Sequence, residues 1–147
     1  MGGADAGHAT GVISFSVAAQ VAGGPGAPAH ARGVIRSQLA GRVPRAVLGD
    51  VALLVTELVA NGVRHGGAGP GRSVQLRLEG RPLGLRVEVV DPGLNRGGTV
   101  APRTFDFARG GGLGLQIVDR VASRWGVGGG PGTSVWFELD VPPEAHL

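Results

Sequence analysis

Apolar residues recur along this chain with two different periods, and these periods predict where its helices and strands lie. Spacing of three to four residues over 44–65 predicts a long amphipathic helix, which starts at Pro44 and ends before the glycine-rich segment 66–71. The same spacing predicts shorter helices over 29–40 and 113–123. Short apolar segments, most of them alternating with polar residues, predict five strands, over 12–17, 73–79, 83–90, 125–127 and 134–141.

The order of these elements predicts the fold class. A strand is followed by two helices, two strands, a long loop rich in Gly and Pro over 91–112, a helix and two final strands. We therefore expect an α+β fold, with helices on one face of a mostly antiparallel sheet. The length of 147 residues suits one domain over 12–142, between a disordered tail at 1–11 and a second tail at 143–147.

Composition excludes several classes of protein. The chain has no Cys, which excludes a disulfide scaffold, thiolate catalysis and Cys-based zinc sites. All 14 basic residues are Arg, and without Lys there can be no Walker A loop and no Schiff-base chemistry. The Arg residues form no basic run, so we expect no direct nucleic-acid binding. We see neither an apolar stretch of membrane-spanning length nor a signal pattern, so we expect no membrane contact and a cytoplasmic location.

A polar stripe on the long helix is the first feature with chemical potential. Glu57, Asn61 and His65 recur every four residues, so they share one face of the helix beside its apolar stripe. A carboxylate, an amide and an imidazole in this arrangement could hold a metal or orient a water molecule. A solvated helix face is the alternative.

Two glycine-containing segments are the next features. Asp91 opens the sequence Asp-Pro-Gly-Leu-Asn directly after a strand, where its carboxylate could accept a hydrogen bond from an exocyclic amine, and Gly93 would let a planar ring approach the backbone. The alternative is an ordinary turn. Residues 110–115, Gly-Gly-Gly-Leu-Gly-Leu, lead into the helix over 113–123. Such a segment can bind phosphate through free backbone N–H groups at a helix N-terminus, or it can be a linker.

In their order and spacing, these motifs resemble the GHKL ATP-binding superfamily over 12–141. Residues 56–66, Thr-Glu-Leu-Val-Ala-Asn-Gly-Val-Arg-His-Gly, resemble its N-box, and 91–95 and 110–115 resemble its two glycine boxes. Residues 132–135 resemble its later Gly-Thr element. Within the superfamily, the chain is most similar to the small anti-sigma-factor serine kinases of bacteria. The resemblance implies a Bergerat-type ATP-binding fold, a two-layer α/β sandwich whose mostly antiparallel sheet is mixed.

The resemblance also implies a role for each matching residue. Asn61 would bind Mg²⁺, and Glu57 would act as a general base on a Ser/Thr hydroxyl or on water. Asp91 would accept a hydrogen bond from the adenine amino group, with support from Thr133, and Gly93 would pack near the ring. The phosphates would meet the backbone N–H groups of Gly112, Leu113, Gly114 and Leu115 and the side chain of Arg109 in the lid. His65 would stack on or hydrogen-bond to the nucleotide or its neighbours, or it would be a plain imidazole at the helix end.

One position departs from the family pattern. Asn95 stands where the first glycine box usually ends in Gly. Asn tolerates left-handed backbone angles better than most residues, so the turn can survive. The lid, over 94–111, would close over the nucleotide.

The function implied by the resemblance is that of a Mg²⁺-ATP-dependent serine/threonine protein kinase. Its partners would be a small anti-sigma-factor antagonist, which it phosphorylates, and a sigma factor. Two alternatives remain: a non-catalytic ATP-sensing module that binds proteins, and a detached histidine-kinase-like ATPase domain. Apolar residues within 12–40 would form a homodimer interface or complete the core of the chain itself.

Overall fold

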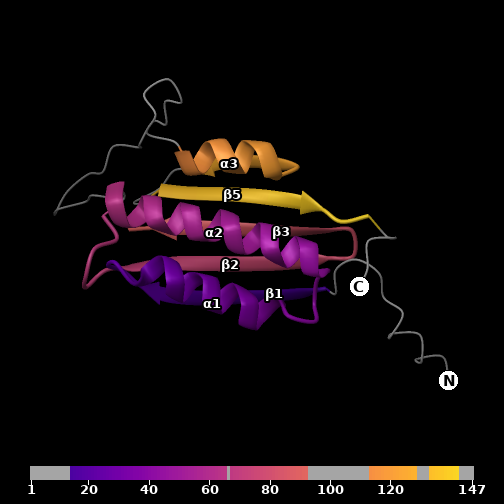
Figure 1. The fold of residues 1–147 in the computed structure, drawn as a ribbon, viewed down its shortest axis with the longest axis horizontal. Coiled ribbons are helices and arrows are strands. Elements are labelled where there is room, and N and C mark those ends of the chain that lie inside the picture. Colours follow the sequence, from indigo (N-terminus) through magenta and orange to yellow (C-terminus); the bar gives the residue numbers. More distant parts are fainter. Residues whose placement is uncertain (1–13, 66, 93–112, 129–132, 143–147) are drawn as a thin grey trace.

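The structure, a computed structural model, describes residues 14–65, 67–92, 113–128 and 133–142. Both predicted tails and the lid lie outside these ranges. The described residues form three helices and five strands, arranged as in Figure 1. In chain order these are β1 Phe15–Ala22, α1 Ala27–Leu39, α2 Arg45–His65, β2 Ser73–Arg81, β3 Gly84–Asp91, α3 Leu113–Val121, β4 Arg124–Gly128 and β5 Thr133–Asp140.

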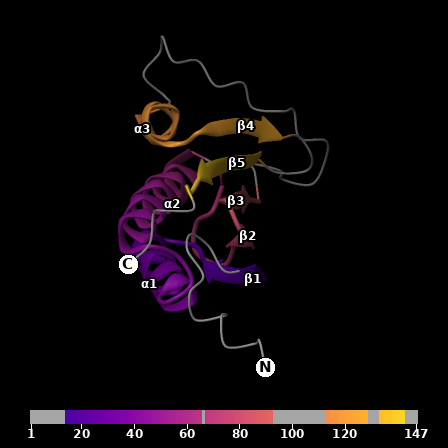
Figure 2. The same cartoon turned by 90° about the vertical axis from the view of Figure 1, so that its right-hand side faces the viewer.

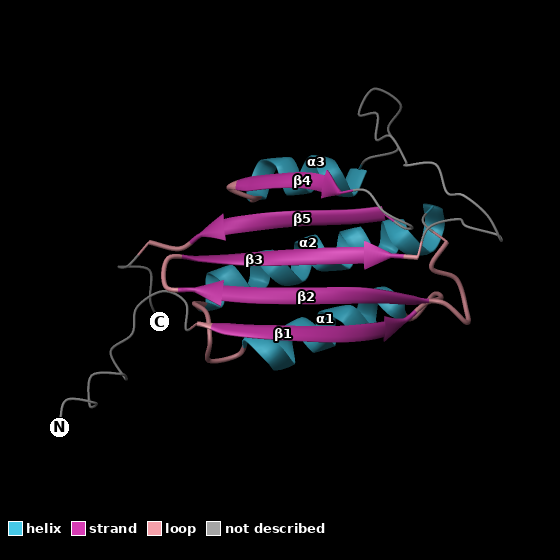
Figure 3. Ribbon diagram, turned by 180° about the vertical axis from the view of Figure 1, so that it is seen from behind, coloured by secondary structure: helices cyan, strands magenta, loops and turns pink. Residues whose placement is uncertain are grey.

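The five strands form one sheet in the order β1-β2-β3-β5-β4. Every pairing between the described strands is antiparallel, so the parallel pair implied by a mixed sheet is not among them. The strand β5 lies between β3 and β4, although β4 precedes it in the sequence (Figure 3). This insertion places the start of β5 against the end of β3, where Thr133 is paired with Asp91.

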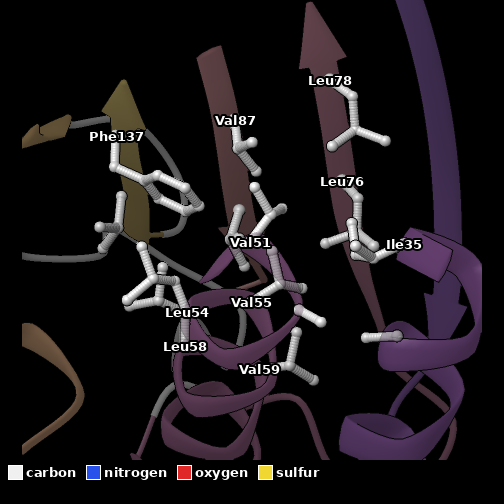
Figure 4. Packing of buried hydrophobic residues seen from close by; sticks show 14 of the residues in the cluster. Ile35, Val51, Leu54, Val55, Leu58, Val59, Leu76, Leu78, Val87 and Phe137 are labelled. Atoms are coloured by element: carbon white, nitrogen blue, oxygen red, sulfur yellow. The ribbon is translucent and has the colours of Figure 1, made fainter. Parts of the chain in front are cut away.

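The helices lie on one face of the sheet, so the expected α+β sandwich is confirmed (Figure 2). Alternation along β2 turns Val74, Leu76 and Leu78 toward the helices and leaves the residues between them exposed. The apolar stripe of α2 packs against this surface (Figure 4), and its fully buried members include Val51 and Leu54. Each such side chain contributes about 1.5–3 kcal/mol through burial.

Most element boundaries differ by one or two residues from those predicted by sequence pattern, and two differences have a clear structural reason. The first strand runs to Ala22, past the predicted end at Val17, because β1 pairs with β2 as far as Ala22 opposite Ser73. The helix α3 ends at Val121, before the predicted end at Ser123. The Ser123 N–H donates to the Glu138 carbonyl at 2.8 Å, so the chain has already joined the sheet there.

The helix α2 is long and apolar enough to cross a membrane by length and composition, contrary to our expectation that no segment reaches this length. In the structure its apolar stripe is buried against the sheet. Its outer side carries Asp50, Glu57 and Arg64 among its polar residues. These features are those of the core helix of an α/β sandwich.

Candidate functional site

Four elements reach the same end of the sandwich. The C-terminal end of α2, the end of β3 and the start of α3 all lie at the left in Figure 1 and at the right in Figure 3. The first residue of β5 is there as well, because Thr133 is paired with Asp91. The fold therefore gathers at one end the N-box helix, the Asp of the first glycine box, and the first described residues of the second glycine box and of the Gly-Thr element, Leu113 and Thr133.

The side chain of Asp91 packs directly against α2. In β3 the residues Leu85, Val87 and Val89 face the helices, and Asp91 continues on the same face of the strand. A Cβ atom on Gly62 would lie 3.3 Å from the Asp91 Cβ and 3.6 Å from its Oδ2. Only the missing side chain of this glycine lets the carboxylate approach the helix so closely.

This contact settles the relative positions of two predicted site residues. Gly62 follows Asn61 in the sequence, so Asp91 lies against the turn of α2 that carries Asn61. Had the two been on opposite sides of the molecule, one pocket could not serve both adenine and a metal. The geometry therefore fits a ligand that spans from Asp91 to the outer flank of α2.

Glu57 and Asn61 occupy that outer flank, one helical turn apart. Glu57 follows Leu54 by three residues, and Asn61 follows Leu58 by three. In Figure 4 these two leucines lie below Phe137 of β5, whereas Val59 lies on the side of α2 that faces α1. The polar stripe is consequently on the side of α2 away from Val59 and α1.

The two polar side chains of the stripe differ in their partners. Within the described part of the chain, the half-buried Glu57 makes no hydrogen bond or ion pair. The Asn61 Oδ1 accepts a hydrogen bond from Arg64 Nη2 at 3.1 Å. The Glu57 carboxylate is thus available as a base, and the Asn61 oxygen faces a cationic group. His65 is the last residue of α2, and its side chain lies outside what the structure describes.

The predicted phosphate site is described only in part. Leu113, Gly114 and Leu115 form the first turn of α3, whose backbone N–H groups have no partner within the helix. This turn carries no acidic residue that would repel an anion. The Leu115 side chain is fully buried, so only its backbone can contact phosphate. Gly93, Gly112 and Arg109 lie outside the described residues.

The oxygen donors on α2 suit a hard cation that is held mainly by the phosphates of a nucleotide and only in part by the protein. Across the ranges that the structure describes, no three His, Cys, Asp or Glu side chains gather as a metal site. The oxygens of Asn61 and Glu57 are of the type that Mg²⁺ prefers. Magnesium commonly takes only one or two protein ligands and completes its shell with phosphates and water. These residues fit a Mg²⁺–nucleotide complex better than a protein-only metal cage.

Pattern reasoning missed Gly62 as a site residue. A signal was present, because glycine inside a strongly apolar helix costs about 1 kcal/mol relative to Ala and is retained mainly where packing requires it. It also missed Ala68, which is fully buried beside Gly62 and Asp91. No local pattern marks this alanine, because its importance depends on a contact between distant segments.

The other face of the sheet has a different character. Two hollows of about 190 and 410 Å³ lie over it or at its rim, and ion-pair residues line both. Arg124 hydrogen-bonds to Glu138 and Asp140, and these bonds hold the pKa of both carboxyl groups below their ordinary values. Asp140 is paired with Gly84, so this cluster lies about 23 Å from Asp91 along β3. Its charged groups already have partners, which makes it a poor ligand site.

Comparison with known proteins shows the family of this chain. A family model described as the histidine kinase-like ATPase domain matches residues 25–139. The chain therefore belongs to the histidine kinase-like ATPase family, within the GHKL superfamily. Domains of this family bind ATP, generally together with Mg²⁺.

No curated protein matches the chain. Among solved structures, it is similar to the histidine kinase domain from the Erythrobacter litoralis EL346 blue-light activated histidine kinase. The identity is 24% and the TM-score 0.48, over 78% of this chain and 59% of that chain. This chain thus spans about three-fifths of that histidine kinase chain.

Proposed function

We propose that this protein is a Mg²⁺-ATP-dependent serine/threonine protein kinase of the anti-sigma-factor type. The observation that carries the proposal is the contact between Asp91 and Gly62. It joins the carboxylate proposed to recognise adenine to the helix that carries Glu57 and Asn61. One nucleotide can then meet all three groups.

Binding of Mg²⁺-ATP would divide among the elements at this end of the sandwich. Asp91 accepts a hydrogen bond from the exocyclic amine of adenine, with Thr133 paired beside it in the sheet. The first turn of α3 offers backbone N–H groups to the phosphates. The amide oxygen of Asn61 is a ligand for Mg²⁺, which neutralises phosphate charge when it is bound. The Asn61 amide must then exchange its bond with Arg64 for the metal.

Glu57 supplies the chemistry in this proposal. Its carboxylate takes the proton of a Ser or Thr hydroxyl while that oxygen attacks the γ-phosphorus of ATP. The bond between the γ-phosphorus and the β,γ-bridging oxygen breaks, and ADP leaves with the electron pair. The carboxylate has no other partner among the described residues, so no competing bond holds it away from the substrate.

Calorimetry and phosphotransfer assays test the proposal together. Wild type should bind Mg²⁺-ATP, and Asn61→Ala should weaken binding in the presence of Mg²⁺. Glu57→Gln should keep nucleotide binding and abolish transfer of the γ-phosphate to an anti-sigma-factor antagonist. The matched control Glu79→Gln changes an exposed carboxylate on the other face of the sheet and should retain activity.

Each alternative function gives a different result in these assays. Nucleotide binding without any transfer, in wild type as in Glu57→Gln, identifies an ATP-sensing module that binds proteins. ATP turnover without transfer to the antagonist identifies a detached ATPase domain. Absence of Mg²⁺-ATP binding in wild type rejects the proposal altogether.

The partners and location belong to the same proposal. We place the protein in the bacterial cytoplasm, where it would bind the antagonist and a sigma factor. A homodimer would use the β1 edge of the sheet. Phe15 and Val17 pack against the core of the chain itself, so the backbone of this edge strand would have to make the contact. Light scattering of the purified protein measures whether a dimer forms.

A further inference from the structure

The turn between β1 and α1 packs closely against the loop between α2 and β2. Gly23 N–H donates to the Arg72 carbonyl at 2.7 Å, and Gly24 N–H donates to the Ala68 carbonyl at 2.9 Å. A Cβ atom on Gly23 would lie 2.4 Å from the carbonyl oxygens of both Ala68 and Gly69. No residue other than glycine can occupy position 23 without displacing this loop.

The loop in turn touches the place where Asp91 meets α2. Ala68 is fully buried, and its N–H donates to the Gly62 carbonyl at 3.0 Å. Its Cβ lies 3.9 Å from the point where a Gly62 Cβ would stand, and the Asp91 Cβ lies 3.3 Å from that same point. Ala68 and Asp91 therefore pack around one position on the helix, and both approach it because Gly62 has no side chain.

From these contacts we propose that the turn at Gly23 and Gly24 determines the base specificity of the nucleotide site by holding the loop at Ala68 in place. The inference rests on the proposed function, in which Asp91 accepts the hydrogen bond from adenine. The turn fixes the position of Ala68, and Ala68 packs at Gly62 beside Asp91. The position of Asp91 in turn sets the preference for adenine. Gly23 is a positioning residue, since in this proposal it acts through Ala68 and Asp91.

Base selectivity separates this role from a general effect on folding. Inosine triphosphate carries the same phosphates as ATP, but it has a carbonyl oxygen where adenine has its amine. Loss of folded protein lowers the bound fraction of both nucleotides equally. A displaced Asp91 weakens the hydrogen bond to the amine of ATP, but it loses no hydrogen bond to the carbonyl oxygen of ITP, because both groups are acceptors. The ratio of the two affinities thus reports on the position of this carboxylate.

The experiment measures binding of Mg²⁺-ATP and Mg²⁺-ITP to the full chain by titration calorimetry. Wild type should prefer ATP, and Gly23→Ala should lower this preference by about 3- to 10-fold without lowering the ITP affinity. The matched control is Gly33→Ala, because a Cβ at that position of α1 meets nothing within 4 Å. It should keep the wild-type ratio.

A second variant covers the case in which Gly23→Ala does not fold. Ala68→Gly removes the supporting methyl group without adding an atom, and it should also lower the ratio. A wild-type ratio in a folded Gly23→Ala protein, or in Ala68→Gly, overturns the inference while the proposed function stands. If wild type binds no ATP, or does not discriminate between the two nucleotides, the assignment of Asp91 fails and the inference fails with it.

Discussion

The contact between Asp91 and α2 gives the sharpest prediction, which compares two glycines of the same helix. In Gly49→Ala the new Cβ meets nothing within 4 Å, whereas in Gly62→Ala it lies 3.3 Å from the Asp91 Cβ. Glycine in a helix interior costs about 1 kcal/mol relative to Ala. We therefore expect Gly49→Ala to stabilise the protein by about 1 kcal/mol.

The same backbone gain applies at Gly62, but packing opposes it there. Carbon atoms in good contact lie about 3.5–4.0 Å apart, so Asp91 must move by a few tenths of an ångström. Overpacking of a well-filled core costs about 1–3 kcal/mol. Gly62→Ala should thus leave the free energy of unfolding unchanged or lower it by up to about 2 kcal/mol. The shift of the carboxylate should also weaken Mg²⁺-ATP binding by about 3- to 10-fold, part of the roughly 1.5–3 kcal/mol of a hydrogen bond to a charged group.

Urea unfolding and titration calorimetry with Mg²⁺-ATP measure the two effects separately. Gly49→Ala should bind the nucleotide as wild type does. The reasoning is refuted if Gly62→Ala gains as much stability as Gly49→Ala and binds Mg²⁺-ATP with wild-type affinity. That outcome would mean that Asp91 does not lie against the helix that carries Asn61.

Three further predictions concern the core and the outer face of the sheet. Leu54→Ala should lower the free energy of unfolding, measured in urea, by about 3–5 kcal/mol because this side chain is fully buried. Leu53 is 45% exposed, so the control Leu53→Ala should change the free energy of unfolding by less than about 0.5 kcal/mol. Gly126→Ala should destabilise the protein by about 1 kcal/mol and change its tryptophan fluorescence, because the new Cβ would lie 2.8 Å from the indole ring of Trp136. The control Gly128→Ala, whose Cβ has its nearest atom at 3.4 Å, should change neither the stability nor the fluorescence. Equal spectra for the two variants would contradict this prediction. The stability of Arg124→Gln should fall less on acidification than that of wild type. Arg124 lowers the pKa values of Glu138 and Asp140 in the folded state, so the stabilisation from these carboxylates is present above about pH 4–5 and is lost as the pH falls below that range. Thermal melts of both proteins from pH 7 to pH 3 should converge toward low pH, and a constant difference in melting temperature would argue against the carboxylate pairing.

The sequence predicted most of the helices and strands because their patterns are local. The long helix was expected over 44–65 and is found as Arg45–His65, since its apolar stripe repeats at the helical period. The β1 strand was harder, because the run Ala18–Ala22 has little apolar alternation of its own. Its strand conformation comes from the backbone bonds with β2, whose partner residues lie more than 50 positions away.

The site divides along the same line. Glu57 and Asn61 share a helix face by virtue of a spacing of four residues, so a single element fixes their relation. The order of motifs and their resemblance to the GHKL superfamily assigned Asp91 to the same pocket, but no local pattern could show where its carboxylate lies. The support given by Ala68 and Gly23 left no signal that a period or a motif detects.

The amino-acid sequence by itself determined the elements, the face of the long helix that carries the polar stripe, and the family. Tertiary structure alone decided that β5 enters the sheet between β3 and β4, that Asp91 meets α2 at Gly62, and that a turn near the start of the chain holds the loop beside it. The reason is physical: backbone geometry fixes relations within one segment, whereas contacts between distant segments depend on how complete surfaces pack and which side chains are absent.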